Sequence, residues 1–154
     1  MPDFGEVLHE AISKLTQAPT TYLAFAFLIF VALILYSLVR GRTISASQVG
    51  WTLYLGALSL WEELVFRVAI PYYLESVGFA LGYGIVVSNL AFGLIHYFTL
   101  RWRWQWCLGA FLGGLALSRQ MEVHFDLLLI TAFHWIGTFI NTPRPPGFRK
   151  DRNH

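Results

Sequence analysis

The first apolar run of the chain, Thr20 to Val39, contains no charged side chain. A helix of about 20 apolar residues is long enough to cross the hydrocarbon core of a bilayer. The rest of the chain has a similar character, because 56% of its 154 residues are hydrophobic and only 13% are charged. Soluble domains carry about 25% charged residues. We therefore predict an integral membrane protein.

Four more apolar runs follow the first. The second contains Pro71 near its end, which should kink or end the helix. The fourth is short and contains Gly109, Gly113 and Gly114, which would permit close helix approach, although the GxxxG-like spacing of 109 and 113 is common by chance. The four runs are Val49 to about Leu74, Phe79 to Leu100, about Trp106 to Ser118, and about Phe125 to Ile140. The fold class that we expect is all-α, a polytopic transmembrane helical bundle of about five spans over residues 20–141.

The two ends of the chain are predicted to lie outside this bundle. Residues 1–19 form an amphipathic pattern, with Asp3 and Glu6 resembling a capping box. This helix either lies at the membrane surface or docks on the bundle. Residues 142–154 are basic and proline-rich, which predicts a flexible cytoplasmic tail. The single cysteine, Cys107, excludes an intrachain disulfide and is most simply a small buried apolar residue.

The basic residues favour one orientation in the membrane. If the spans alternate, eight of the eleven Lys and Arg residues fall on one side: Arg40, Arg42, Arg101, Arg103, Arg144, Arg149, Lys150 and Arg152. The positive-inside rule then places the N-terminus outside and the C-terminus in the cytoplasm. We interpret the aromatic and basic stretch 101–106 as an interfacial belt and expect no nucleic-acid partner, because it flanks two spans.

Ionised residues interrupt the second apolar run at Glu62, Glu63 and Arg67. Each costs about 2.5–3.5 kcal/mol at the centre of a membrane helix. Glu63 and Arg67 are four residues apart, so they share a helix face and can pair. Glu62 points about 100° away and lacks this partner.

Two further polar sets lie in the later spans. Asn89 and His96 share one face of the third span, and His134, Thr138 and Asn141 share one face of the fifth. Such residues either hold helices together by hydrogen bonds or mark a functional site. Because two acids, one arginine and two histidines occur on three spans of a small protein, we favour a site.

The chemistry that suits these residues is hydrolysis by an activated water. An unpaired carboxylate in apolar surroundings is a competent general base, a histidine can share the water, and a second histidine can donate to a developing oxyanion. The sequence contains no GxSxG and no HExxH motif. We expect no cofactor, although Glu62, His96 and His134 could bind a zinc ion if they converge.

These residues resemble the motifs of a known family. Residues 62–67 are similar to the EExxxR motif of the CAAX-protease and bacteriocin-processing (CPBP) family of glutamic intramembrane proteases, and residues 92–96 match its FxxxH motif. His134 stands where the third motif, HxxxN or HxxxD, supplies a histidine. The matched region is about residues 50–141, and the short chain is similar to myxosortase-like members. The resemblance implies a prokaryotic plasma membrane protein with a membrane-associated protein or peptide substrate.

Carried over to this chain, the resemblance makes Glu62 the general base, with His96 holding the water. Glu63 and Arg67 would be a supporting ion pair, and His134 would help to bind the oxyanion. The chain departs from the family at the last motif position, where the usual Asn or Asp is Thr138. Either Thr138 or Asn141 takes over this role, or the oxyanion hole is weaker.

Other functions stay open at this stage. The alternative is a non-catalytic membrane partner, such as an immunity or assembly factor, with a structural Glu–Arg–His network. A proton-coupled carrier is a weaker option, because the chain shows no repeat symmetry. The depth of the residues in the membrane conflicts with the protease interpretation. If residues are counted from the cytoplasmic ends of straight, upright spans, Glu62 and His96 lie at different depths.

Overall fold

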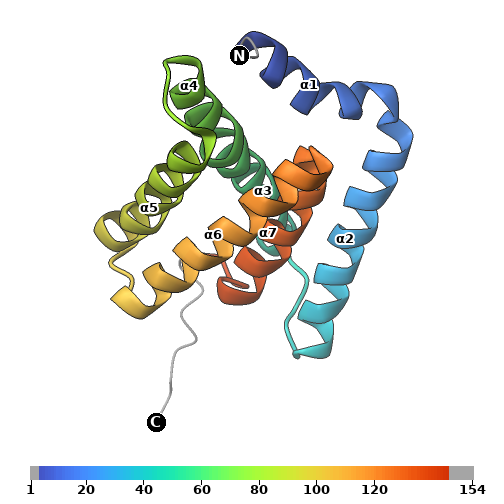
Figure 1. Ribbon diagram of the computed structural model, residues 1–154. Coiled ribbons are helices and arrows are strands. Elements are labelled where there is room, and N and C mark those ends of the chain that lie inside the picture. The colour runs from blue at the N-terminus through green and yellow to red at the C-terminus, as the bar shows by residue number, and fades with distance from the viewer. Residues whose placement is uncertain (1–3, 146–154) are drawn as a thin grey trace.

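The computed structural model describes residues 4–145, and every regular element in that range is helical (Figure 1). Among these helices, only α2 and α5 are both long and apolar enough to cross a membrane by length and composition. The elements are α1 (Phe4–Gln17), α2 (Pro19–Val39), α3 (Ala46–Glu63), the π-helix η1 (Leu64–Ala69), α4 (Ile70–Ser76), α5 (Leu81–Leu100), α6 (Trp104–His124) and α7 (Leu127–Asn141). The all-α prediction is therefore confirmed.

One long helical segment, made of α3, η1 and α4, carries the acidic stretch. It begins at Ser45, whose side chain accepts a hydrogen bond from the backbone N–H of Gln48 at 3.2 Å. The helix does not end at Pro71, which lies in the first turn of α4, directly after η1. The wider turns of a π-helix occur mostly as short insertions and often at functional sites, and here they contain Arg67.

Helix α6 is longer than the sequence predicted. The expected end was Ser118, but the helix continues to His124 and ends where Phe125 adopts a left-handed conformation with φ of 46°. Tertiary contacts stabilise this extension. Met121 is buried in the core, and Lys14 of α1 donates to the backbone carbonyl of His124.

Helix α1 packs on the bundle through Val7 and Ala11. Both are buried in one apolar cluster, which also contains Val68, Met121, Leu127 and Ile130. Of the two alternatives for residues 1–19, the structure thus contains the docked helix. Contact of this helix with the membrane surface stays a prediction, and Asp3 of the expected capping box lies outside the described residues.

A second cluster joins α2, α3 and α7. Its buried members are Ile29, Leu33, Leu55, Ala132, Trp135 and Phe139. The start of the predicted tail is held here as well, because Trp51 Nε1 donates to the carbonyl of Thr142 at 2.8 Å. Residues 146–154 of that tail lie outside the described range.

The connections alternate between two ends of the bundle. In Figure 1 the α2–α3 link, the α5–α6 link and the end of α7 lie toward the bottom, whereas α1 and the end of α4 lie at the top. Segments with many basic residues thus gather at one end.

Cys107 is buried, as predicted.

Candidate active site

The site is built around a buried ion pair on α3 and η1. Arg67 Nε lies 3.2 Å from Glu63 Oε2, and both side chains are fully buried. This is the pair that helical spacing predicts. In a membrane protein a buried charge needs such a partner, because isolated it would be very costly.

His134 of α7 faces both carboxylates. Its Nδ1 lies 2.5 Å from Glu63 Oε1, and its Nε2 lies 3.4 Å from Glu62 Oε2. Glu63 is therefore shared between Arg67 and His134, whereas the sequence interpretation gave it only the arginine. The missed contact joins residues 71 positions apart, and no local spacing signals it.

Phe92 of α5 connects His96 to the rest of the cluster. Its ring centroid lies 4.5 Å from that of His96 and 5.6 Å from that of His134. Arg67 Cζ lies 4.7 Å from the same centroid, at cation–π distance. The FxxxH spacing identified Phe92, but not its position among these three side chains.

His96 has a defined orientation. It is buried, and its Nδ1 donates to the Phe92 carbonyl at 2.7 Å. In a neutral imidazole with Nδ1 protonated, Nε2 is the acceptor. Trp102 packs against the ring at 4.7 Å between centroids, a contact that its place in the predicted aromatic belt does not indicate.

The expected depth mismatch disappears when both residues are counted from the turn that joins α4 to α5. Glu62 lies 14 residues before the end of α4 at Ser76, and His96 lies 15 residues after the start of α5 at Leu81. At about 1.5 Å per residue both lie a little over 20 Å from the turn. Phe92 packs against the rings of both His96 and His134, and His134 contacts Glu62.

Glu62 and His134 are the accessible members of the cluster. Their side chains are 19% and 14% exposed, whereas that of Glu63 is 0% exposed. A substrate could reach Glu62 and one face of His134 but not the Glu63–Arg67 pair. Accessibility thus distinguishes the two carboxylates of the acidic stretch.

The two candidates for the last motif position differ in placement. Thr138 lies one turn after His134 and is half-buried, whereas Asn141 lies at the end of α7 and is exposed. Seven residues of helix separate His134 from Asn141 by about 10 Å. No described contact joins either side chain to the carboxylates.

No described contact joins Asn89 to His96, although they share a helix. Its Nδ2 donates to Ser118 Oγ at 2.9 Å and to the Ile85 carbonyl at 2.8 Å. This buried amide connects α5 to α6. It corresponds to the helix-linking role that the sequence left open.

A metal ion would need several ligand side chains around one point. Within residues 4–145, no group of three or more His, Cys, Asp or Glu side chains is arranged to hold one. Glu62 and His134 approach each other, but both His134 nitrogens face carboxylates. A zinc ion at Glu62, His96 and His134 would have to displace these contacts.

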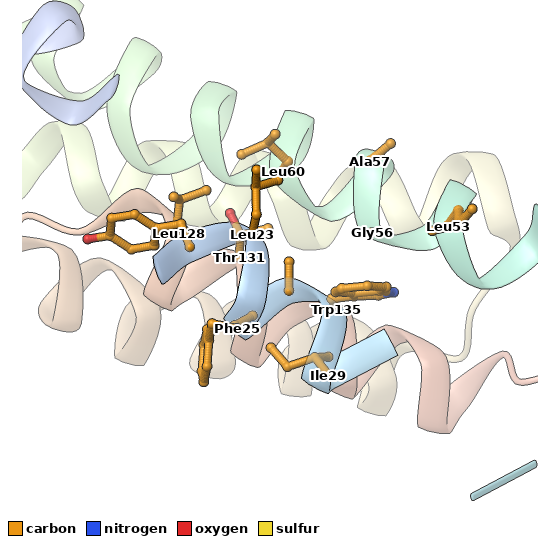
Figure 2. Close-up of a pocket in the computed structure, with 13 residues that line it drawn as sticks. Leu23, Phe25, Ile29, Leu53, Gly56, Ala57, Leu60, Leu128, Thr131 and Trp135 are labelled. Atoms are coloured by element: carbon orange, nitrogen blue, oxygen red, sulfur yellow. The ribbon is translucent and has the colours of Figure 1, made fainter. Parts of the chain in front are cut away.

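An apolar pocket lies elsewhere, between α2, α3 and α7. Its volume is about 290 Å³, and it is lined by residues such as Ile29, Gly56, Leu60 and Trp135 (Figure 2). None of the charged or histidine residues of the cluster lines it. At 3.6 residues per turn, Leu60 projects about 160° and Gly56 about 120° away from Glu62 on α3.

Comparison with known proteins identifies the relationship. The model of one protein family, described as type II CAAX prenyl endopeptidase Rce1-like, matches residues 44–140. The chain belongs to this Rce1-like family. The matched residues are more than half of the chain and include every candidate site residue except Asn141, so the sequence resemblance to CAAX proteases is confirmed. Rce1-like proteins are membrane proteases, which disfavours a non-catalytic partner. No curated protein and no solved structure matches this Rce1-like chain.

Proposed function

We propose that this protein is an intramembrane endopeptidase of the glutamic type, which hydrolyses a peptide bond in a membrane-associated protein. The observations that support the proposal are one contact between two helices and one ring that links a third helix to them. Glu62 of α3 and His134 of α7 are in contact, and Phe92 connects His96 of α5 to His134. The Rce1-like relationship supports the same reaction.

Glu62 acts as the general base. It is the accessible carboxylate of the pair, and it has no arginine of its own. A water between Glu62 and His96 Nε2 would lose its proton to the carboxylate as it attacks the scissile carbonyl. The protonated Glu62 would then give this proton to the amine that leaves as the C–N bond breaks. The hydrogen bond from His96 Nδ1 to the Phe92 carbonyl holds the ring so that Nε2 is an acceptor.

His134 stabilises the oxyanion that forms. Glu63 accepts from its Nδ1, which fixes the ring in one orientation, as a carboxylate does for the histidine of a catalytic triad. The contact of Nε2 with Glu62 is long, at 3.4 Å, so a substrate oxygen can replace it. A protonated His134 donates from both nitrogens and balances the charge of two carboxylates and one arginine.

Thr138 takes the place of the family's Asn or Asp. It lies one helical turn after His134 and is half-buried. Its hydroxyl can donate one hydrogen bond, as an amide would. Asn141 is too far along α7 to share a carbonyl oxygen with His134.

The membrane placement completes the proposal. The segments 19–39, 46–76, 81–100, 104–124 and 127–141 cross the bilayer, with the amino-terminal end outside and the carboxyl-terminal end in the cytoplasm. The basic connections at the lower end in Figure 1 support this orientation. The membrane is a prokaryotic plasma membrane.

The test uses the purified chain in phospholipid nanodiscs with a quenched fluorescent peptide that ends in a farnesylated CAAX sequence. The same peptide without the farnesyl group is the second substrate. We expect cleavage that Glu62→Gln and His96→Ala abolish while both variants stay inserted and helical. Cleavage of both peptides would assign a protease without prenyl recognition. Cleavage of neither, or activity that survives Glu62→Gln, would overturn the proposal.

A further inference from the structure

Helix α6 approaches the polar cluster at a single glycine. A Cβ built on Gly109 or on Gly113 would meet nothing within 4 Å. A Cβ built on Gly114 would overlap Asn89 Oδ1 and would lie 3.0 Å from Arg67 Nη2. The predicted GxxxG-like spacing of 109 and 113 is therefore not where the helices meet, and Gly114 is the close contact.

Two complementary groups border this point. The Nη1 and Nη2 atoms of Arg67 are buried and have no hydrogen-bond partner among residues 4–145, and the same holds for Asn89 Oδ1. A buried donor or acceptor without a hydrogen-bond partner destabilises the folded protein, and such groups are rare in proteins. The guanidinium is positive and the amide oxygen carries partial negative charge, so each is a suitable electrostatic partner for the other.

The amide of Asn89 is fixed from its other side. Its Nδ2 donates to the Ile85 carbonyl at 2.8 Å and to Ser118 Oγ at 2.9 Å. Rotation away from position 114 would break both bonds. A side chain at position 114 would therefore displace either this amide or the guanidinium of Arg67.

We propose that Gly114 is a positioning residue of the proposed active site, and that Asn89 is the second electrostatic partner of Arg67. The effect passes from Arg67 to Glu63 at 3.2 Å and from Glu63 to His134 at 2.5 Å. The absence of a side chain on α6 thus determines how the oxyanion-binding histidine is held. The catalytic consequence rests on the proposed function, but the geometric one does not.

The first experiment compares two neighbouring alanine substitutions in the full chain in nanodiscs. Gly114→Ala should lower kcat for the farnesylated CAAX peptide by roughly 10²-fold with little change in KM, because small displacements of catalytic groups have effects of this size. Gly113→Ala adds the same atom where nothing lies within 4 Å. This control should keep wild-type kcat.

The second experiment does not depend on activity. The ring of His134 is followed by ¹⁵N NMR as a function of pH, with its signal assigned from its loss in His134→Gln. Glu62 and Glu63 contact this ring, and Phe92 packs against it as well as against Arg67 and His96. We expect Gly114→Ala to move the midpoint of its titration, and Gly113→Ala to leave it unchanged.

A second variant guards against misfolding of the first. Asn89→Ala removes the amide oxygen without adding volume near Gly114, and it should shift the same titration. Because both changes act on the surroundings of Arg67, the double variant should shift the titration by less than the sum of the two single shifts. Additive shifts would overturn the proposal.

The outcomes separate the two proposals. If the wild-type chain cleaves no peptide, the proposed function fails, while the titration still tests Gly114. If His134 titrates alike in wild type, Gly114→Ala and Asn89→Ala, the role of Gly114 is overturned even in an active protease. An equal shift in Gly113→Ala would also overturn it, since that would reflect a general effect on α6.

Discussion

His134 Nδ1 lies 2.5 Å from Glu63 Oε1, across 71 residues of chain. This contact joins α7 to the long segment that carries both acids. It makes Glu63 the shared partner of a histidine and an arginine, and it leaves Glu62 as the carboxylate that a substrate can reach.

Glu62→Gln should remove activity without unfolding the protein. The amide cannot accept the proton of water, so we expect kcat to fall by roughly 10²–10⁴-fold, the usual contribution of general base catalysis. The side chain is 19% exposed and has no buried counter-charge of its own. Unfolding in detergent and circular dichroism should therefore match wild type within about 1 kcal/mol. An equal loss of stability and activity would instead indicate a structural carboxylate.

Glu63→Gln should act mainly on stability. It leaves the buried guanidinium of Arg67 without its counter-charge, and breaking a buried ion pair in this way costs about 3–5 kcal/mol. The measurement is the free energy of unfolding in mixed micelles. The double variant Glu63→Leu with Arg67→Leu should recover most of that loss, because it removes both charges. No recovery would mean that the pair is not the source of the effect.

Thr138→Ala and Asn141→Ala should differ. If Thr138 donates to the oxyanion, its loss should lower kcat by about 10²–10³-fold, the effect of removing one such donor. Asn141 is exposed at the end of α7, so its loss should leave kcat unchanged. The measurement is steady-state kinetics of both variants with the farnesylated CAAX peptide. The reverse pattern would assign the role to Asn141, and two inactive variants would point to α7 as a whole.

Chelation should not remove activity. Both His134 nitrogens face carboxylates, so the proposed reaction uses the charges of the chain itself. Dialysis against EDTA and 1,10-phenanthroline should leave kcat at the value of the untreated enzyme. Activity that is lost and then restored by zinc would assign the ion to Glu62, His96 and His134 and would replace the general-base mechanism.

Gly84→Ala should destabilise the hairpin of α4 and α5. A Cβ there would lie 2.8 Å from the backbone carbonyl oxygen of Pro71, which cannot move as a side chain can. Overpacking of this kind costs about 1–3 kcal/mol. Gly82→Ala is the matched control, since nothing lies within 4 Å of its Cβ. Thermal unfolding of the two variants in nanodiscs is the measurement.

The sequence by itself determined the features that depend on short distances along the chain. The pairing of Glu63 with Arg67 follows from helical spacing, because residues four apart lie on one face whatever the rest of the fold does. The long apolar runs and the low proportion of charged residues predicted the all-α fold class. The motifs around Glu62 and His96 were sufficient to identify the protease family, which the match over residues 44–140 confirmed.

Only the tertiary structure decided the contacts between helices. Spacing along the chain does not determine how far one helix is shifted or rotated against another. It therefore could not predict that His134 contacts two acids, or that Glu62 and His96 lie at similar distances from the α4–α5 turn. For the same reason the sequence could not predict that Gly113 and Gly114, which are adjacent, have different surroundings. One faces open space, and the other faces Asn89 and Arg67 because of the rotation of α6 in the bundle.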